Sequence, residues 1–247
     1  MRFDNVSMTG IPMHYETDYS RTQIHFLTTA PEWLPRLGKL ELPHDILDLG
    51  SGGGRNSIYL RREFREAHIV ALDLSFVRCA CCLQSTSVDV VCGDAMELPF
   101  ASESFDLILS TQVIEHVPDD RALVKEAHRI LKKGGKMIIS SVLRLSHGWY
   151  FYKNQGHWVL DPTHVREYRS RDDFLALFGG GLSILDVTVD PIRFSPAHFV
   201  YRLLAKVGLV EKPDPEFFSK TAFTRSLERC GLRIPGYRTI TATMRKG

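Results

Sequence analysis

The sequence predicts an α/β fold in which a mostly parallel, seven-stranded sheet carries helices on both faces. Short runs rich in Val, Ile and Leu alternate with helical segments along most of the 247 residues, a pattern typical of parallel sheets. The first four runs are almost wholly apolar, as expected for strands buried on both faces. The expected strands cover about residues 45–50, 68–74, 88–92, 105–111, 135–142, 183–189 and 237–245.

The helices expected between these strands carry local signals at their ends. The third expected helix has Asp119 and Asp120 in its first turn, and it ends at Lys132 before Gly134. The helix dipole favours acidic residues at the start and cations at the end, and glycine is a common stop. The fourth expected helix has Ser170 at its N-cap position. The expected helices cover about residues 54–65, 76–86, 119–132 and 171–178.

A glycine-rich turn after the first expected strand is the strongest functional signal in the chain. Asp48 is followed by Gly50, Gly52, Gly53 and Gly54. Glycine lets the backbone turn with positive φ and lets a ligand approach closely. The N–H groups at the start of the next helix point back toward such a ligand. The turn therefore predicts a nucleotide-type cofactor site at the carboxyl end of a strand.

The spacing of these glycines excludes two common nucleotide sites. The dinucleotide fingerprint G-x-G-x-x-G needs a third glycine where this chain has Arg55 or Ser57, depending on the register. The phosphate-binding P-loop needs a lysine after its glycines, and none follows here. The pattern that fits is D-x-G-x-G-x-G, which runs from Asp48 to Gly54.

Further motifs stand at the ends of the next expected strands. They are Ala71-Leu-Asp-Leu-Ser75, Cys92-Gly-Asp-Ala-Met-Glu-Leu-Pro-Phe100, the run from Phe105 to Pro118, and Leu131-Lys-Lys-Gly-Gly-Lys-Met-Ile-Ile139. Taken in this order with the glycine turn, they resemble the class I S-adenosylmethionine-dependent methyltransferases of the small-molecule type, similar to methyltransferase domain 11. The resemblance covers about residues 45–142 strongly and the rest of the chain weakly.

The resemblance implies a Rossmann-like sheet with an antiparallel last strand, and S-adenosyl-L-methionine as the cofactor. It implies that the Asp73 carboxylate accepts from the ribose hydroxyls and that Leu74 packs on the adenine face. Asp94 and the backbone N–H of Ala95 would bind the adenine edge. The implied cofactor-binding residues are Asp48, Gly50, Ser51, Gly52, Gly54, Asp73, Leu74, Asp94, Ala95, Met96, Ser110, Thr111 and Gln112.

The implied reaction is in-line displacement at the methyl group by an oxygen, nitrogen or carbon nucleophile of a small molecule, which could be linked to a lipid or a sugar. Such transfer depends mainly on positioning, although a hydroxyl or protonated amine also needs a base. His116 is the candidate base because it follows the fourth strand, but it could instead orient the helix near Pro118. Glu115 could equally be a solvated charge there. His164 and Tyr19 are further candidates.

Substrate choice is expected to lie outside the cofactor motifs. Residues 1–44 are expected to form a lid on the substrate side of a methyltransferase domain over 45–247. The aromatic- and His-rich segment at about 147–168 is expected to form a substrate wall. A helical insertion at about 191–236 would cover the core or form a dimer contact, or else touch a membrane as a basic amphipathic helix. Spaced histidines in a loop usually form hydrogen bonds, so no metal is predicted.

The composition of the chain limits the kinds of binding partner that the sequence predicts. A net charge of +2 gives no electrostatic case for nucleic acid, and no apolar run reaches the roughly 18 residues of a membrane span. The five cysteines show neither disulfide nor zinc spacing. We therefore expect a cytoplasmic monomer or homodimer. A non-catalytic S-adenosylmethionine-binding module and an NAD-type oxidoreductase remain the alternatives, and the missing third glycine counts against the latter.

Overall fold

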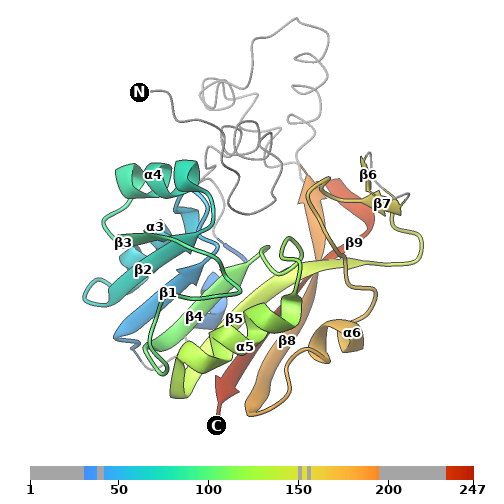
Figure 1. Cartoon of the computed structure of the whole chain (residues 1–247). Coiled ribbons are helices and arrows are strands. Elements are labelled where there is room, and N and C mark those ends of the chain that lie inside the picture. The colour runs from blue at the N-terminus through green and yellow to red at the C-terminus, as the bar shows by residue number, and fades with distance from the viewer. Residues whose placement is uncertain (1–30, 38–41, 150–151, 155–156, 195–231) are drawn as a thin grey trace, which may run out of the picture.

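The computed structural model describes residues 31–37, 42–149, 152–154, 157–194 and 232–247 (Figure 1). The strands are β1 (Asp45–Leu49), β2 (His68–Asp73), β3 (Asp89–Cys92), β4 (Phe105–Thr111), β5 (Leu131–Arg144), β6 (Tyr152–Asn154), β7 (His157–Val159), β8 (Leu182–Phe194) and β9 (Leu232–Lys246). The helices are α2 (Leu34–Leu37), α3 (Arg55–Glu63), α4 (Phe76–Ser85), α5 (Asp120–Ile130) and α6 (Arg171–Leu175).

Seven of these strands form one mixed sheet in the order β3-β2-β1-β4-β5-β9-β8. The pairs among β1 to β5 are all parallel. Strand β9 is antiparallel to both of its neighbours, β5 and β8. The predicted fold class, including the antiparallel last strand, is therefore confirmed. Strands β6 and β7 form a separate hairpin that the sequence did not predict.

Helices cover both faces of the sheet, and each face has its own hydrophobic core (Figure 1). Successive residues of a strand point to opposite faces, so Ile69 joins one core and Val70 the other. The core that contains Ile69 packs against α2, α3 and α4. The core that contains Val70 packs against α5 and α6, with Leu123 and Phe174 both fully buried. This double coverage explains why the central strands are apolar throughout.

Helix α5 begins as predicted, but it ends earlier than the sequence indicates. The Asp119 side chain caps the helix by accepting from the backbone N–H groups of Arg121 and Ala122. The helix ends at Ile130, and β5 begins at once with Leu131, which pairs with Phe105. Gly134 has φ 76° and lies where the register between β4 and β5 shifts. Gly134 therefore serves an irregular strand start and not a helix stop.

The last two strands are longer than expected. Strands β8 and β9 extend into both ends of the segment at about 191–236 for which helix was predicted, because the antiparallel pairing continues as far as Phe194 and Leu232. The rest of that segment, 195–231, lies outside the described residues, as do most of the expected lid and Tyr19. None of the described helices is long and apolar enough to cross a membrane.

Candidate cofactor and acceptor site

The predicted cofactor motifs meet at one edge of the sheet because the strands before them are parallel. Leu49 at the end of β1 is in register with Leu72 on β2 and with Ser110 on β4. Asp73 at the end of β2 is in register with Cys92 at the end of β3. The chain crosses from β3 over to β4, so strand order reverses beside β1. Ligands in open α/β sheets bind at such a switch point, outside the carboxyl ends of the strands.

The glycine turn is shaped by backbone hydrogen bonds and by close contact with the loop after β4. The N–H groups of Gly50 and Ser51 donate to the Leu72 carbonyl at 2.7 and 2.9 Å. Gly50, at φ 76°, approaches Val113 so closely that a Cβ at this position would lie 2.2 Å from the Val113 Cγ2 atom. Gly52 and Gly54 also have positive φ, at 57° and 93°. A Cβ at Gly54 would lie 2.6 Å from Thr86 Cγ2. The turn therefore needs glycine for conformation and, at Gly50 and Gly54, for space as well.

Asp73 holds the glycine turn through its carboxylate. Its Oδ2 atom accepts from the Gly52 N–H at 2.8 Å, and its Oδ1 atom accepts from the Ser75 N–H at 2.9 Å. The Arg78 guanidinium lies 4.0 Å from Oδ2. A carboxylate oxygen can accept more than one hydrogen bond, so each oxygen retains capacity for a ribose hydroxyl. Asp73 thus fits the predicted role, with a second task of fixing the turn.

Asp48 lies beneath the turn and is fully buried. Its Oδ2 atom accepts from the Ser57 hydroxyl at 2.6 Å, which ties the end of β1 to helix α3. Burial raises the pKa of the Asp48 carboxyl to about 7, and the nearby Asp73 carboxylate acts in the same direction. Because Asp48 is buried and joins β1 to α3 on either side of the glycine turn, we interpret it as a residue that positions the turn and does not contact the cofactor.

The raised pKa of Asp48 predicts a pH dependence of stability. An exposed carboxyl in the unfolded chain ionises near pH 4, whereas folded Asp48 stays protonated up to about pH 7. The unfolded state therefore binds fewer protons between these values, and the free energy of unfolding should fall as the pH rises through this window. Asp48→Asn should show a shallower fall than the parent chain in urea titrations across that range. Equal slopes would contradict the burial argument.

The segment after β3 supplies the predicted adenine side. The Asp94 Oδ1 atom accepts from the Met96 N–H at 2.8 Å, which closes a tight turn. Ala95 is buried, and Met96 is half-buried. The Leu74 side chain is 40% exposed at the start of the neighbouring loop. An exposed leucine beside this turn is consistent with an apolar surface for a flat ring.

The end of β4 joins the sheet edge to the described part of the N-terminal segment. The Thr111 hydroxyl accepts from the Asn56 side-chain NH₂ group at 2.8 Å, and the Oδ1 atom of the same side chain accepts from the Trp33 indole N–H at 3.0 Å. Gln112 has φ 55° and donates its N–H to the Ser140 carbonyl at 3.1 Å. The Ser110 hydroxyl is buried and has no hydrogen-bond partner among the described residues, which is consistent with a group that a ligand completes.

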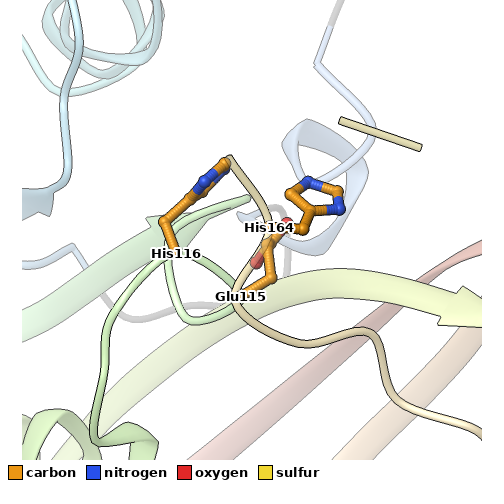
Figure 2. A group of neighbouring side chains, drawn as sticks. All are labelled: Glu115, His116 and His164. Atoms are coloured by element: carbon orange, nitrogen blue, oxygen red, sulfur yellow. The ribbon is translucent and has the colours of Figure 1, made fainter. Parts of the chain in front are cut away.

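Glu115, His116 and His164 converge just beyond β4 (Figure 2). Glu115 is fully buried, so the alternative of a solvated helix-entry charge is wrong. Its Oε2 atom accepts from the Ser141 hydroxyl at 2.9 Å, and its Oε1 atom has no hydrogen-bond partner among the described residues. Burial raises the pKa of the Glu115 carboxyl to about 7.

His116 is oriented by the loop that carries His164. The His116 Nδ1 atom lies 3.0 Å from the Thr163 hydroxyl, and the two imidazole rings are 4.9 Å apart between centroids. Burial lowers the pKa of His116 to about 4, and His164 and Arg78 act in the same direction. Since Arg78 also lies beside Asp73, the cluster is within electrostatic reach of the cofactor turn.

His164 is buried against a second carboxylate. Its Nδ1 atom lies 2.9 Å from Glu167 Oε1. Burial lowers the pKa of His164, but the hydrogen bond that its ring donates to Glu167 and the charges of Glu115 and Glu167 outweigh this effect, so the net pKa is raised. The Arg144 guanidinium in turn lies 3.8 Å from Glu167 Oε2. His164 therefore belongs to a buried chain of polar groups that links β5 to the loop after β7.

Two residues expected in a substrate wall have a supporting role. Arg166 donates to the carbonyls of Ile114 and Pro118 at 3.1 and 2.6 Å, which fixes the turn between β4 and α5. Tyr168 is buried and donates to Asp120 Oδ2 at 3.0 Å. The substrate wall at about 147–168 stays a prediction, and these two side chains have a structural task whether or not it holds. The loop serves the site, because Arg166 holds in place the turn that presents Glu115.

The sequence match decides the family. Residues 47–139, which include the glycine turn, Asp73, Asp94 and the Glu115–His116 pair, match the family model described as methyltransferase domain. Residues 47–139 of this chain form a methyltransferase domain. The match confirms the predicted family and, with it, S-adenosyl-L-methionine as the cofactor that such a domain takes.

The curated proteins that are similar to this chain include methyltransferases that act on different acceptors. The chain is 32% identical over 149 residues to a malonyl-[acyl-carrier protein] O-methyltransferase of Hahella chejuensis, which covers 57% of this chain and 51% of the relative. It is also 32% identical over 123 residues to phosphoethanolamine N-methyltransferase 1 of Arabidopsis thaliana, covering 48% of this chain and 25% of the relative. The chain thus spans about half the length, or less, of these relatives.

Solved structures share the methyltransferase domain's fold. Phosphoethanolamine N-methyltransferase 2 of Haemonchus contortus aligns with a TM-score of 0.58 at 19% identity, covering 86% of this chain and 51% of that one. The [4+2]-cyclase SpnF aligns with a TM-score of 0.55 at 21% identity, covering 84% of this chain and 76% of that one. At these identities the likeness concerns the fold alone, and function has to be argued from the site.

Proposed function

We propose that this protein transfers the methyl group of S-adenosyl-L-methionine to an oxygen, nitrogen or carbon nucleophile of a small molecule by in-line displacement. The observation that carries the proposal is the Asp73 carboxylate, which holds the Gly52 N–H at 2.8 Å and faces the switch point of the sheet. One acidic group there both shapes the glycine turn and offers acceptors for a ribose. A phosphate would be repelled by the same carboxylate.

In this proposal the residues of the domain bind and orient, and the bound cofactor supplies the electrophilic methyl group. Asp73 would accept from the ribose hydroxyls, and Asp94 with the Ala95 N–H would bind the adenine edge above Leu74. Gly50 and Gly52 would leave room for the methionine end of the cofactor. Transfer then needs an acceptor atom held in line, and correct positioning alone can supply much of the rate acceleration.

The acceptor side of the proposed site is the cluster beyond β4. His116, the expected base, has a pKa held down to about 4, so its ring is neutral near pH 7 and has a lone pair to offer. His164 is paired with Glu167, as a histidine in a base role often is. We propose that these two rings face the acceptor. Tyr19 and a lid over residues 1–44 stay predictions, because nearly all of that segment lies outside the described residues.

The names of the relatives do not agree on one acceptor element. One name specifies O-methylation of a malonyl group and another N-methylation of phosphoethanolamine, so both oxygen and nitrogen acceptors occur among proteins similar to this chain. We further propose a cytoplasmic monomer or homodimer. The four described cysteines are free thiols, in line with a reducing compartment.

Calorimetric titration with S-adenosylmethionine, S-adenosylhomocysteine and NAD tests the cofactor assignment. We expect heat of binding with the first two ligands and none with NAD, because the turn lacks the dinucleotide glycine spacing. Heat with NAD alone would overturn the proposal. Release of S-adenosylhomocysteine across a panel of small hydroxyl, carboxyl and amine compounds then tests catalysis. Cofactor binding without turnover on any acceptor class would favour the non-catalytic module.

A further inference from the structure

The cluster of Glu115, His116 and His164 has the donor set of a metal site. Each residue offers one ligand atom, and these atoms lie within 4.8 Å of one another (Figure 2). Glu115 and His116 come from the turn that leaves β4, and His164 comes from the loop after β7. Two imidazoles and one carboxylate are a common ligand set for Zn²⁺ and for Fe²⁺ with open coordination positions.

Hydrogen bonds around His116 define which of its nitrogens carries a lone pair. The Thr163 hydroxyl lies 2.6 Å from Asp161 Oδ1, to which it must donate because the carboxylate oxygen can only accept. The Thr163 oxygen therefore accepts from His116 Nδ1, 3.0 Å away. The Thr163 carbonyl, 3.3 Å from Nδ1, favours the same tautomer. The lone pair of His116 is thus on Nε2.

The other two residues are oriented in the same manner. His164 Nδ1 is paired with Glu167 Oε1 at 2.9 Å, which makes Nε2 the nitrogen that would coordinate. Glu115 Oε2 is held by the Ser141 hydroxyl at 2.9 Å. Histidines that bind metals almost always donate their second ring N–H to a carboxylate or a backbone carbonyl, which fixes the tautomer. Both histidines of the cluster have such an acceptor.

The Oε1 atom of Glu115 gives an independent indication of a ligand. Glu115 is fully buried, and this oxygen has no hydrogen-bond partner among the described residues. A buried carboxylate oxygen without a partner costs free energy and calls for an explanation, such as an ion. The guanidinium groups of Arg144 and Arg166 lie next to other carboxylates, those of Glu167 and Asp120. A divalent cation would give the Oε1 atom of Glu115 a partner.

We propose that Glu115, His116 and His164 bind one divalent transition-metal ion of the Zn²⁺ type, with open positions directed at the acceptor. Ligand atoms on a tetrahedral zinc lie about 3.5 Å apart, so the cluster must close by about 1 Å when the ion binds. The part of the inference that concerns the acceptor rests on the proposed function, and it replaces the base role of His116, because the Nε2 lone pair would bind the ion. A metal-bound hydroxyl loses its proton more readily, which makes it a better methyl acceptor. Metal binding itself does not depend on that function.

The test is titration of the chelator-treated full chain with Zn²⁺ alone, followed by calorimetry, and with Co²⁺, followed by visible absorption. We expect one ion per chain and Co²⁺ bands that indicate nitrogen ligands. Glu115→Gln keeps an acceptor for Ser141, and His116→Gln keeps a polar side chain of similar length. Each should weaken Zn²⁺ binding by about tenfold or more, since even loss of an outer-shell partner commonly costs 10- to 100-fold.

His68→Gln is the matched control, because His68 also lies beside carboxylates, 3.0 Å from Asp89 and 3.4 Å from Asp45, but at the opposite ends of the strands. It should bind Zn²⁺ like the parent chain. The inference is overturned if the parent chain binds no stoichiometric Zn²⁺ or Co²⁺, or if the two cluster variants bind as tightly as it does. Equal weakening by His68→Gln would also overturn it.

Cofactor binding by the same variants separates this inference from the proposed function. Retained heat with S-adenosylmethionine shows that Glu115→Gln and His116→Gln are folded, so a loss of Zn²⁺ affinity then supports the site. The stoichiometry and Co²⁺ spectrum of the parent chain decide the question if a variant does not fold. Because the metal titrations contain neither cofactor nor acceptor, their failure would leave the methyl-transfer proposal standing.

Discussion

Asp73→Asn is expected to weaken S-adenosylmethionine binding by about 2–3 kcal/mol, which corresponds to a Kd about 30- to 150-fold higher. The carboxylate now accepts from two backbone N–H groups, those of Gly52 and Ser75. An amide has one oxygen, so one N–H would face an NH₂ group, and the ribose would lose a charged acceptor. The measurement is calorimetric titration with the cofactor.

Asp89→Asn controls for the loss of a negative charge. Asp89 begins the neighbouring strand β3, and its side chain is exposed and paired with His68. The same chemical change there should leave the cofactor Kd unchanged, because this end of the strand lies away from the glycine turn. If Asp73→Asn also bound the cofactor like the parent chain, Asp73 would not contact the ribose, and its role would be confined to the turn.

The sheet and the cofactor side could be predicted because their signals are local in the sequence. The glycine turn needs positive φ at Gly50, Gly52 and Gly54, and glycine at such positions is visible from spacing alone. Asp73 is the last residue of β2, and Asp94 lies two residues beyond the end of β3. Parallel strands bring such positions to one edge whatever the details of packing, so the geometry follows once the strands are assigned.

The cluster beyond β4 could not be predicted, because its members meet only through tertiary contacts. His116 and His164 are separated by 48 positions in the sequence. The sequence made each of them a catalytic candidate on its own and did not indicate that they meet. The burial of Glu115 depends on Ser141 from β5 and on the loop held by Arg166. The link from Trp33 through Asn56 to Thr111 is equally non-local. No spacing rule joins these residues.

Gly50→Ala is expected to have the largest effect on stability among glycine substitutions in the turn. The φ of 76° costs an alanine about 1–2 kcal/mol. The new Cβ would also lie 2.2 Å from Val113 Cγ2 and 2.9 Å from Cγ1, and overpacking of this kind adds about 1–3 kcal/mol. The displaced loop would also lower cofactor affinity. Urea unfolding of the cofactor-free protein measures the first effect, and calorimetry measures the second.

Gly180→Ala separates conformational strain from steric clash. Gly180 has a similar φ of 68°, but a Cβ there would have nothing within 4 Å. It should lose only about 1–2 kcal/mol of stability and bind the cofactor normally. Adding Val113→Ala to Gly50→Ala removes both clashing methyl groups, so the double variant should regain part of the lost stability, as a coupling energy in a double-mutant cycle. Purely additive losses would mean that Gly50 is required for its backbone angle alone, and that the turn does not depend on its close approach to Val113.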